Sequence, residues 1–177
     1  MKNLSKAFYI SSFLSGSILP GVLVLFGALL GADEGLLIVI GVVPPLYSIY
    51  IILRLTYAMW SSIQDDQARM TPGNAVKLLF VPIFNIYWMY QVLIGFVDDY
   101  NSFISRNEIE TPNLKYNFFG AHFVLNLFLL VPGVGGFVAI INLVVASIMI
   151  SEICDAVNAV FYAMSRRAEG LLKESVR

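Results

Sequence analysis

The sequence predicts an all-α integral membrane protein with four transmembrane helices in two hairpins and a re-entrant or interfacial helix on the cytoplasmic side. Its composition, its uncharged runs and the distribution of its basic residues predict this fold. Of 177 residues, 58% are hydrophobic and only 13% are charged, and the mean hydropathy is +0.78. Soluble domains carry charge on roughly a quarter of their residues. A soluble enzyme, a nucleic-acid module and a disordered chain are therefore excluded, and 1–177 is one membrane domain.

Long runs without charged residues place the spanning helices. A hydrocarbon core of ~30 Å needs about 20 helical residues. The run 116–151 contains no Lys, Arg, Asp or Glu, and His122 is its only histidine. As one helix it would be ~54 Å long, but it contains the strong breaker PGVGG at 132–136. It is therefore predicted to be a hairpin. The predicted spans are about 8–31, 36–60, 114–131 and 137–161.

The run 78–97 decides between four and five spans. The protein has 11 basic residues, and neither predicted hairpin tip contains one. If 78–97 does not span, every Lys and Arg lies on one side, as the positive-inside rule favours, and both termini are cytoplasmic. Trp88 in the middle of the run and the breaker Pro82 also favour a re-entrant or interfacial helix at about 72–105. A fifth span remains the alternative.

The start of the chain resembles a signal peptide only in part. Lys2 and Lys6 precede an apolar stretch. That stretch is longer than the 7–15 residues of a typical signal-peptide core. We therefore expect the first helix to be retained.

Ionisable residues near the membrane indicate a candidate interhelical charge pair. Arg54 lies near the end of the second predicted span, and Glu152 and Asp155 lie on the last. Counting from the hairpin tips puts all three at a similar depth, ~22–27 Å down. Pairing neutralises charges that are expensive alone in a membrane. The cluster is either a coupling or proton-relay site or an interhelical clamp beside the headgroups.

A second candidate is an intramembrane polar track. His122 and Asn126 are one turn apart on the third predicted span, and Asn142 lies on the fourth. They would form a path for a transporter, or polar packing between helices, which is commoner. With one Cys (Cys154) and one His in the chain, a disulfide framework and a Cys/His metal site are excluded. No cofactor is predicted.

The segment 78–103 carries eight aromatic residues, and we predict that it holds whatever function exists. Thr71 reads as a helix N-cap followed by Pro72 at the first helical position, with Pro82 ending that helix. Asn85 is expected to satisfy backbone groups freed at the break. The segment is either a packing wedge or a docking or gating surface. The candidate surface residues are Pro82, Asn85, Trp88, Gln91, Asp98 and Asn101.

Three stretches of the sequence form a recognisable pattern. They are YAMWSSIQDD at 57–66, TPGNAVKLLFVPIFNIYW at 71–88 and DDYN at 98–101. The segment 71–88 is similar to that of an uncharacterised group of bacterial multi-pass membrane proteins, which are marked by a TPGxAVxxLFxPxFNxYW-like segment. The Cys–Asn element CDAVN at 154–158 also resembles that group. The resemblance covers 57–101 well and the rest loosely. It implies a bacterial inner-membrane location and no established activity.

These observations predict a non-enzymatic membrane component, an assembly partner or scaffold. No GxSxG, HExxH or phosphate-cradling glycine loop occurs. The expected partners are the lipid bilayer and a protein or a second copy of the chain, with no nucleic acid. The alternative is a small transporter or channel that uses the broken segment 71–97 as a half-helix element. An intramembrane enzyme ranks third.

Overall fold

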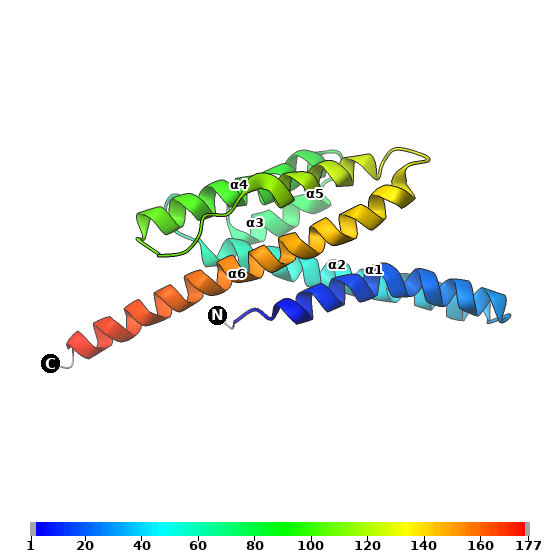
Figure 1. Ribbon diagram of the computed structural model, residues 1–177, viewed down its shortest axis with the longest axis horizontal. Helices are drawn as coiled ribbons and strands as arrows, with labels where there is room; N and C mark the ends of the chain where they lie inside the picture. The colour runs from blue at the N-terminus through cyan, green and yellow to red at the C-terminus, as the bar shows by residue number, and fades with distance from the viewer. Residues whose placement is uncertain (1–2, 176–177) are drawn as a thin grey trace. The chain divides into compact units, whose positions relative to one another are not determined.

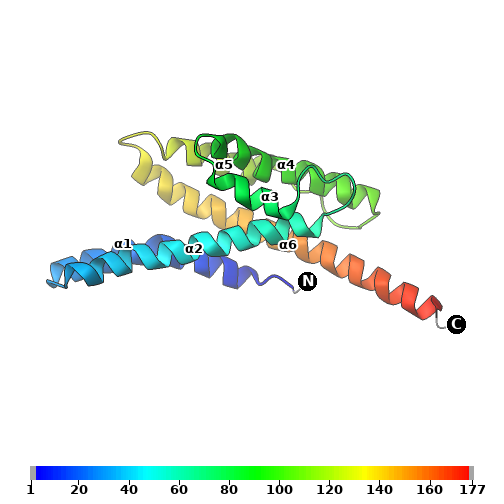
Figure 2. The same ribbon diagram turned by 180° about the vertical axis from the view of Figure 1, so that it is seen from behind.

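The computed structural model describes residues 3–175, and every regular element in that range is a helix (Figures 1 and 2). In chain order they are α1 (Lys6–Leu29), α2 (Glu34–Ser62), α3 (Pro72–Lys77), the 3₁₀ turn η1 (Leu78–Phe80), α4 (Phe84–Arg106), α5 (Tyr116–Phe128) and α6 (Gly135–Ser175). The all-α prediction is confirmed. Helices α1, α2 and α6 are long and apolar enough to cross a membrane. Both termini are predicted to be cytoplasmic. The end residues on which this prediction falls, including Lys2 and Arg177, lie outside the described residues.

The chain divides into two compact units. The smaller unit is Ser5–Leu55, which holds α1 and most of α2. The larger unit begins at Thr56 and also includes Asn3 and Leu4. Each unit is described by itself below.

The smaller unit is a helical hairpin with a tight turn. Gly31 has a φ of +71°, which glycine adopts without steric cost, and the Ala32 amide donates to the Gly27 carbonyl at 2.8 Å. The two helices also approach closely near Gly16, because a Cβ there would lie 1.8 Å from Oγ of Ser48. Helix α1 begins two residues before the start of the predicted 8–31 span and ends two residues before the end of that span.

The larger unit packs α4 against α5 and α5 against α6 (Figures 1 and 2). Its core contains the fully buried aromatic side chains Trp60, Phe96, Tyr100 and Phe119. Trp60 and Phe96 meet edge to face with ring centroids 5.7 Å apart, a favourable geometry for aromatic pairs. The N-terminal segment is held to α6 because Asn158 accepts from the Leu4 amide at 2.7 Å and donates to its carbonyl at 2.9 Å.

Helix α5 is shorter than the predicted span at 114–131. It has 13 residues, which give a length of roughly 20 Å. The chain leaves the α-helix before Pro132: the amides of Leu130 and Val131 make turn bonds of 3.1 Å three residues back, and Gly133 has a φ of +88°. The α-helix therefore ends at Phe128, before the chain reaches the breaker motif at 132–136.

Helix α6 is longer than the predicted span at 137–161. It runs for 41 residues from Gly135 to Ser175, about 60 Å. No proline interrupts the chain after Phe161, so the backbone continues as a helix through the charged residues that end the apolar stretch.

The segment predicted at 72–105 is broken into α3, η1 and α4. Thr71 is the N-cap of α3, because its hydroxyl accepts from the Asn74 amide at 3.2 Å, so the cap prediction is confirmed. The helix tightens into η1 and ends before Pro82, because the residue preceding a proline favours extended backbone; Val81 has φ −84° and ψ 113°.

The expectation for Asn85 is wrong. Backbone groups satisfy the break themselves: the Phe84 amide donates to the Pro82 carbonyl at 2.7 Å, and the Asn85 amide donates to the Val81 carbonyl at 2.9 Å. The Asn85 side chain is exposed. The tight turn brings carbonyls within reach of these amides, so the side chain is not needed.

Candidate functional site

Arg69, in the loop between α2 and α3, bonds to several polar side chains of α4. Its Nε donates to Asp99 at 2.8 Å, its backbone amide donates to the other oxygen of Asp99 at 3.0 Å, and its Nη atoms reach Gln91 at 3.3 Å and Asp98 at 3.4 Å. Asp98 also accepts a hydrogen bond from the Tyr116 hydroxyl. We call Arg69, Gln91, Asp98, Asp99 and Tyr116 the Arg69 cluster. It joins the α2–α3 loop, α4 and the start of α5.

The Arg69 side chain lies across α4 at Gly95. A Cβ at Gly95 would lie 2.7 Å from Nη1 and 3.2 Å from Cδ and Cζ of Arg69. Glycine is therefore needed here for close approach. The Asp99 side chain is only 13% exposed, and its two oxygens accept hydrogen bonds from Nε and from the backbone amide of Arg69.

An aromatic cluster fastens α3 to the start of α4. The Trp88 indole donates to the Asn74 carbonyl at 3.2 Å, and its ring stacks on Phe84 with centroids 5.6 Å apart. Tyr87 belongs to this cluster, because its ring lies against Phe84 with centroids 5.5 Å apart. Gln91 links the cluster to the Arg69 cluster, because its amide donates to the Tyr87 hydroxyl at 3.1 Å. The break at 81–83 is thus held from both sides.

Polar contacts between three pairs of residues anchor the end of α4 and its connection to α5. Asn101 accepts from the Leu114 amide at 2.8 Å and donates to the Leu114 carbonyl at 3.0 Å. Arg106 pairs with Asp65 at 2.5 Å, and Arg167 on α6 donates to the Asn107 carbonyl. The hydrogen bond from Arg106 lowers the pKa of Asp65 below its usual range. The connection is therefore an ordered surface.

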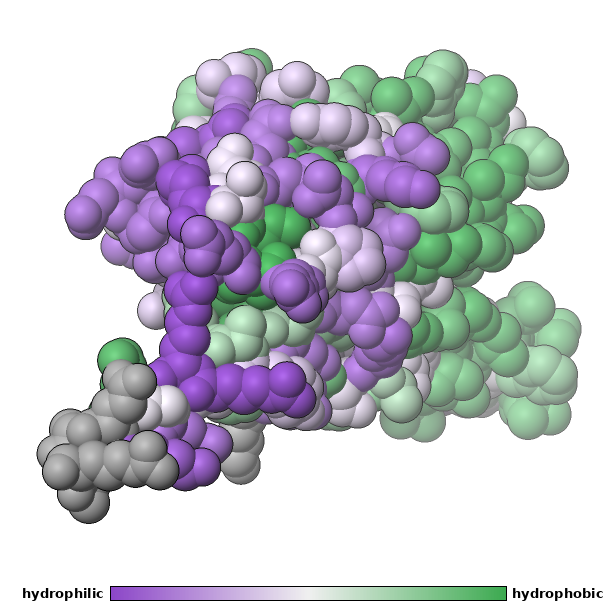
Figure 3. All heavy atoms as spheres, turned by 60° about the vertical axis from the view of Figure 1, so that its left-hand side comes forward, coloured by the Kyte–Doolittle hydropathy of each residue, from purple (hydrophilic) through white to green (hydrophobic). Residues whose placement is uncertain are grey.

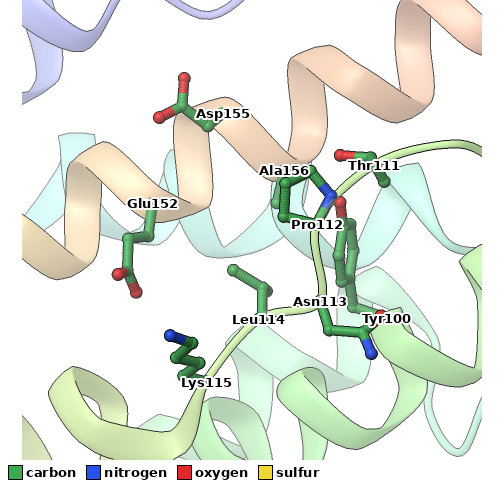
Figure 4. A pocket seen from close by; sticks show the side chains of 9 residues that line it. All are labelled: Tyr100, Thr111, Pro112, Asn113, Leu114, Lys115, Glu152, Asp155 and Ala156. Atoms are coloured by element: carbon green, nitrogen blue, oxygen red, sulfur yellow. The ribbon is translucent and has the colours of Figure 1, made fainter.

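A cavity of about 280 Å³ lies between this connection and α6 (Figure 4). We call it the α6 cavity. Its walls are formed by residues 111–115, by Tyr100 and by Glu152, Asp155 and Ala156. Oε2 of Glu152 is buried and has no hydrogen-bond partner among the described residues. The end of α4 and the α4–α5 connection lie at the left of Figure 1. Figure 3 brings that left-hand side forward and shows that the surface there is largely hydrophilic.

The predicted polar track residues contact one another. Nδ1 of His122 lies 2.7 Å from Oδ1 of Asn142, and Nε2 lies 3.1 Å from the Asn126 amide nitrogen. The Asn126 amide also donates to the His122 carbonyl at 2.7 Å. Asn142 is buried. Both ring nitrogens of His122 are thus engaged, and the three side chains join α5 to α6.

The predicted docking residues do not form one free surface. Gln91 and Asp98 belong to the Arg69 cluster, Asn101 holds Leu114, and Trp88 holds α3. Of the six residues, Pro82 and Asn85 are exposed, and the side chain of Asp98 is 43% exposed although it is bonded to Arg69. Sequence analysis missed Arg69 and Asp99, whose signal was a lone arginine in a loop followed 30 residues later by a paired carboxylate.

The predicted pairing of Arg54 with Glu152 or Asp155 stays a prediction. Arg54 lies in the smaller unit, whereas both carboxylates lie in the larger one. Glu152 and Asp155 do come together, since both line the α6 cavity.

Among the described residues, no group of three or more His, Cys, Asp and Glu side chains is arranged to hold a metal ion. Comparisons with protein-family models, with curated proteins and with solved structures find no match to this chain.

Proposed function

We propose that this chain is a non-enzymatic component of a bacterial inner-membrane complex, serving as an assembly partner or scaffold. Three apolar helices fit membrane insertion, and the resemblance of segment 71–88 supports the bacterial location. The polar groups of the Arg69 cluster are used to hold the fold together. They support a rigid platform rather than a reactive site.

The proposed topology has four spans with both termini and all basic loops in the cytoplasm. Helices α1, α2 and α6 supply three crossings. Helix α5 provides about 20 Å, and the exposed apolar residues Leu129, Leu130 and Val131 would complete the fourth. Helix α4 has adequate length but is not among the helices apolar enough to span, which supports an interfacial or re-entrant position. The five-span alternative would place Arg106 and Lys115 outside, against the positive-inside rule.

We infer that a membrane partner docks at the exposed apolar break between η1 and α4, around residues 81–83. Ile83 is 89% exposed and has a φ of +66°, a conformation that is costly for a β-branched residue. Phe80 at 65% and Tyr87 at 55% are exposed beside it. We call Phe80, Ile83, Phe84 and Tyr87 the break surface. Strain of this kind clusters at binding sites, and the aromatic cluster holds the surface in place.

Co-purification of the native complex tests this function. Ile83→Ser should abolish capture of a stoichiometric membrane partner while leaving the thermal unfolding temperature near that of wild type. The matched control is Ile140→Ser, which removes a similarly exposed side chain, 65% exposed, from α6, and it should retain the partner. Asn85→Ala should behave like wild type in stability, whereas Trp88→Ala should be less stable because its indole holds α3. Equal partner yields from both isoleucine variants, or no stoichiometric partner at all, would contradict the proposal.

A small transporter or channel is the second candidate. The hydrogen-bonded side chains of His122, Asn126 and Asn142 and the non-helical backbone at 81–83 favour it, because irregular backbone at membrane depth usually lines a cavity. A solute-dependent rise in unfolding temperature that His122→Leu removes would favour transport over scaffolding.

A further inference from the structure

The smaller unit has a groove between its two helices. The groove has a volume of about 420 Å³ and is lined by three residues of α1, from Phe13 to Ser17, and by five of α2, from Pro45 to Leu53. It is open to its surroundings, because Ser17 is exposed and Ile49 is 52% exposed. We call it the hairpin groove. It belongs neither to the break surface nor to the α6 cavity.

The lining of the hairpin groove suits an apolar occupant. Of the lining residues, only Ser17 and Ser48 have polar side chains. The Ser17 hydroxyl donates to the Phe13 carbonyl at 2.8 Å, and the Ser48 hydroxyl donates to the Ser12 carbonyl at 2.7 Å, so both hydroxyl protons are already used. Helices α1 and α2 are both long and apolar enough to cross a membrane, so in a bilayer the groove would face hydrocarbon. A polar ligand would lose its hydration there with little return.

The length of the hairpin groove matches one leaflet of a bilayer. Ser17 lies 11 residues after Lys6, the first residue of α1, which is ~16 Å along the helix and close to half of a ~30 Å hydrocarbon core. Beyond that depth the two helices close on one another, because a Cβ at Gly27 would lie 2.6 Å from Cδ2 of Leu37. A helix of a second copy would need the whole length of the hairpin, whereas a lipid acyl chain needs only one leaflet.

The charges of the smaller unit favour an anionic headgroup at the outer end of the groove. Its two basic residues, Lys6 and Arg54, lie at one end, and its two acidic residues lie at the hairpin tip. Lys6 is seven residues before Phe13, so about two helical turns put it on the side of α1 that lines the groove. Arg54 is nine residues after Pro45, so about two and a half turns put it on the opposite side of α2.

We propose that the hairpin groove binds one acyl chain of an anionic phospholipid from the surrounding bilayer, with the lipid phosphate at Lys6. The lysine ammonium has three N–H donors, so it can serve the phosphate in addition to a protein partner. The positive end of the α1 helix dipole adds to its charge. The groove lies in the smaller unit and the break surface in the larger one, so the inference does not depend on the proposed scaffold function.

The test counts the lipids that stay bound to the full chain in native mass spectrometry. The protein in maltoside micelles is mixed with equal amounts of phosphatidylglycerol and phosphatidylcholine that carry the same acyl chains. The wild type should retain one phosphatidylglycerol per chain in preference to phosphatidylcholine, because only phosphatidylglycerol has a net negative charge. Phosphatidylglycerol should also raise the unfolding temperature more than phosphatidylcholine does.

The two basic residues separate a specific headgroup contact from a general effect of charge. Lys6→Gln should weaken phosphatidylglycerol binding about five-fold, as expected for one basic residue near an anionic headgroup, and should leave phosphatidylcholine binding unchanged. The matched control, Arg54→Gln, removes an equal charge from the far side of α2 and should bind as wild type does. Equal retention of the two lipids by the wild type, or equal losses in the two variants, would overturn the proposal.

A second pair of variants tests the groove itself and decides the matter if Lys6→Gln does not fold. Ile49→Trp fills the groove and should reduce retention of both lipids. The matched control is Val43→Trp, at a side chain that is 56% exposed and does not line the groove; it should retain lipid as wild type does. Unchanged retention in Ile49→Trp, or the loss of a dimer that reveals a second copy in the groove, would refute the assignment.

Discussion

The close contact between Gly95 and Arg69 makes a quantitative prediction about stability. Replacing a helical glycine with alanine normally stabilises a helix by about 1 kcal/mol. At Gly95, however, the new Cβ would lie 2.7 Å from Nη1 of Arg69, so the guanidinium must move. That movement breaks the bonds from Nη1 to Gln91 at 3.3 Å and from Nη2 to Asp98 at 3.4 Å.

The balance of these effects gives the sign. Two long, partly exposed bonds are worth about 1–3 kcal/mol together, which equals or exceeds the helix-propensity gain of about 1 kcal/mol. Gly95→Ala should therefore lower the free energy of unfolding by up to about 2 kcal/mol in the wild-type background. In an Arg69→Ala background nothing remains to displace, and the same substitution should raise the free energy by about 1 kcal/mol.

A double-mutant cycle measures this coupling. Unfolding of the four proteins in mixed micelles, followed by tryptophan fluorescence, should give a coupling free energy of about 1–3 kcal/mol. The matched control is Gly120→Ala on α5, where a Cβ would meet nothing within 4 Å, and its effect should not depend on Arg69. Additivity of Gly95→Ala and Arg69→Ala within about 0.5 kcal/mol would refute the proposed packing.

Three further predictions concern topology and charge. In a Cys154→Ala background, an impermeant thiol reagent added outside should label Asp33→Cys and Gly135→Cys but not Ser102→Cys; strong labelling at 102 would establish five spans. Because Arg106 lowers the pKa of Asp65, the pair should stabilise the fold above about pH 4, the unfolded pKa, and lose that effect as the pH falls through the lower folded pKa. Asp65→Asn should cost less than about 1 kcal/mol and should flatten the stability profile in that acid range, whereas an unchanged profile argues against the pair. Arg54 should lie within about 8 Å of Glu152 or Asp155, one Debye length, and an experimental structure that shows it farther from both would end that reasoning.

The sequence by itself determined the features that depend on local chemistry. Uncharged runs identified α1, α2 and α6, because twenty apolar residues in a row have few alternatives to a spanning helix. The Thr71 cap and the breaker after α5 follow from backbone sterics within a few residues. The i, i+4 spacing of His122 and Asn126 likewise put both on one face of α5.

Only the tertiary structure decided which distant groups meet. Arg69 lies 30 residues before Asp99, and no periodicity links a loop arginine to a particular carboxylate on α4. The use of Gln91, Asp98 and Asn101 as internal contacts depends on how the α2–α3 loop and residues 111–115 fold back onto that helix. The unpartnered oxygen of Glu152 is likewise a property of the space around it, because burial is a sum over neighbours brought together by packing and has no signature in the local chain.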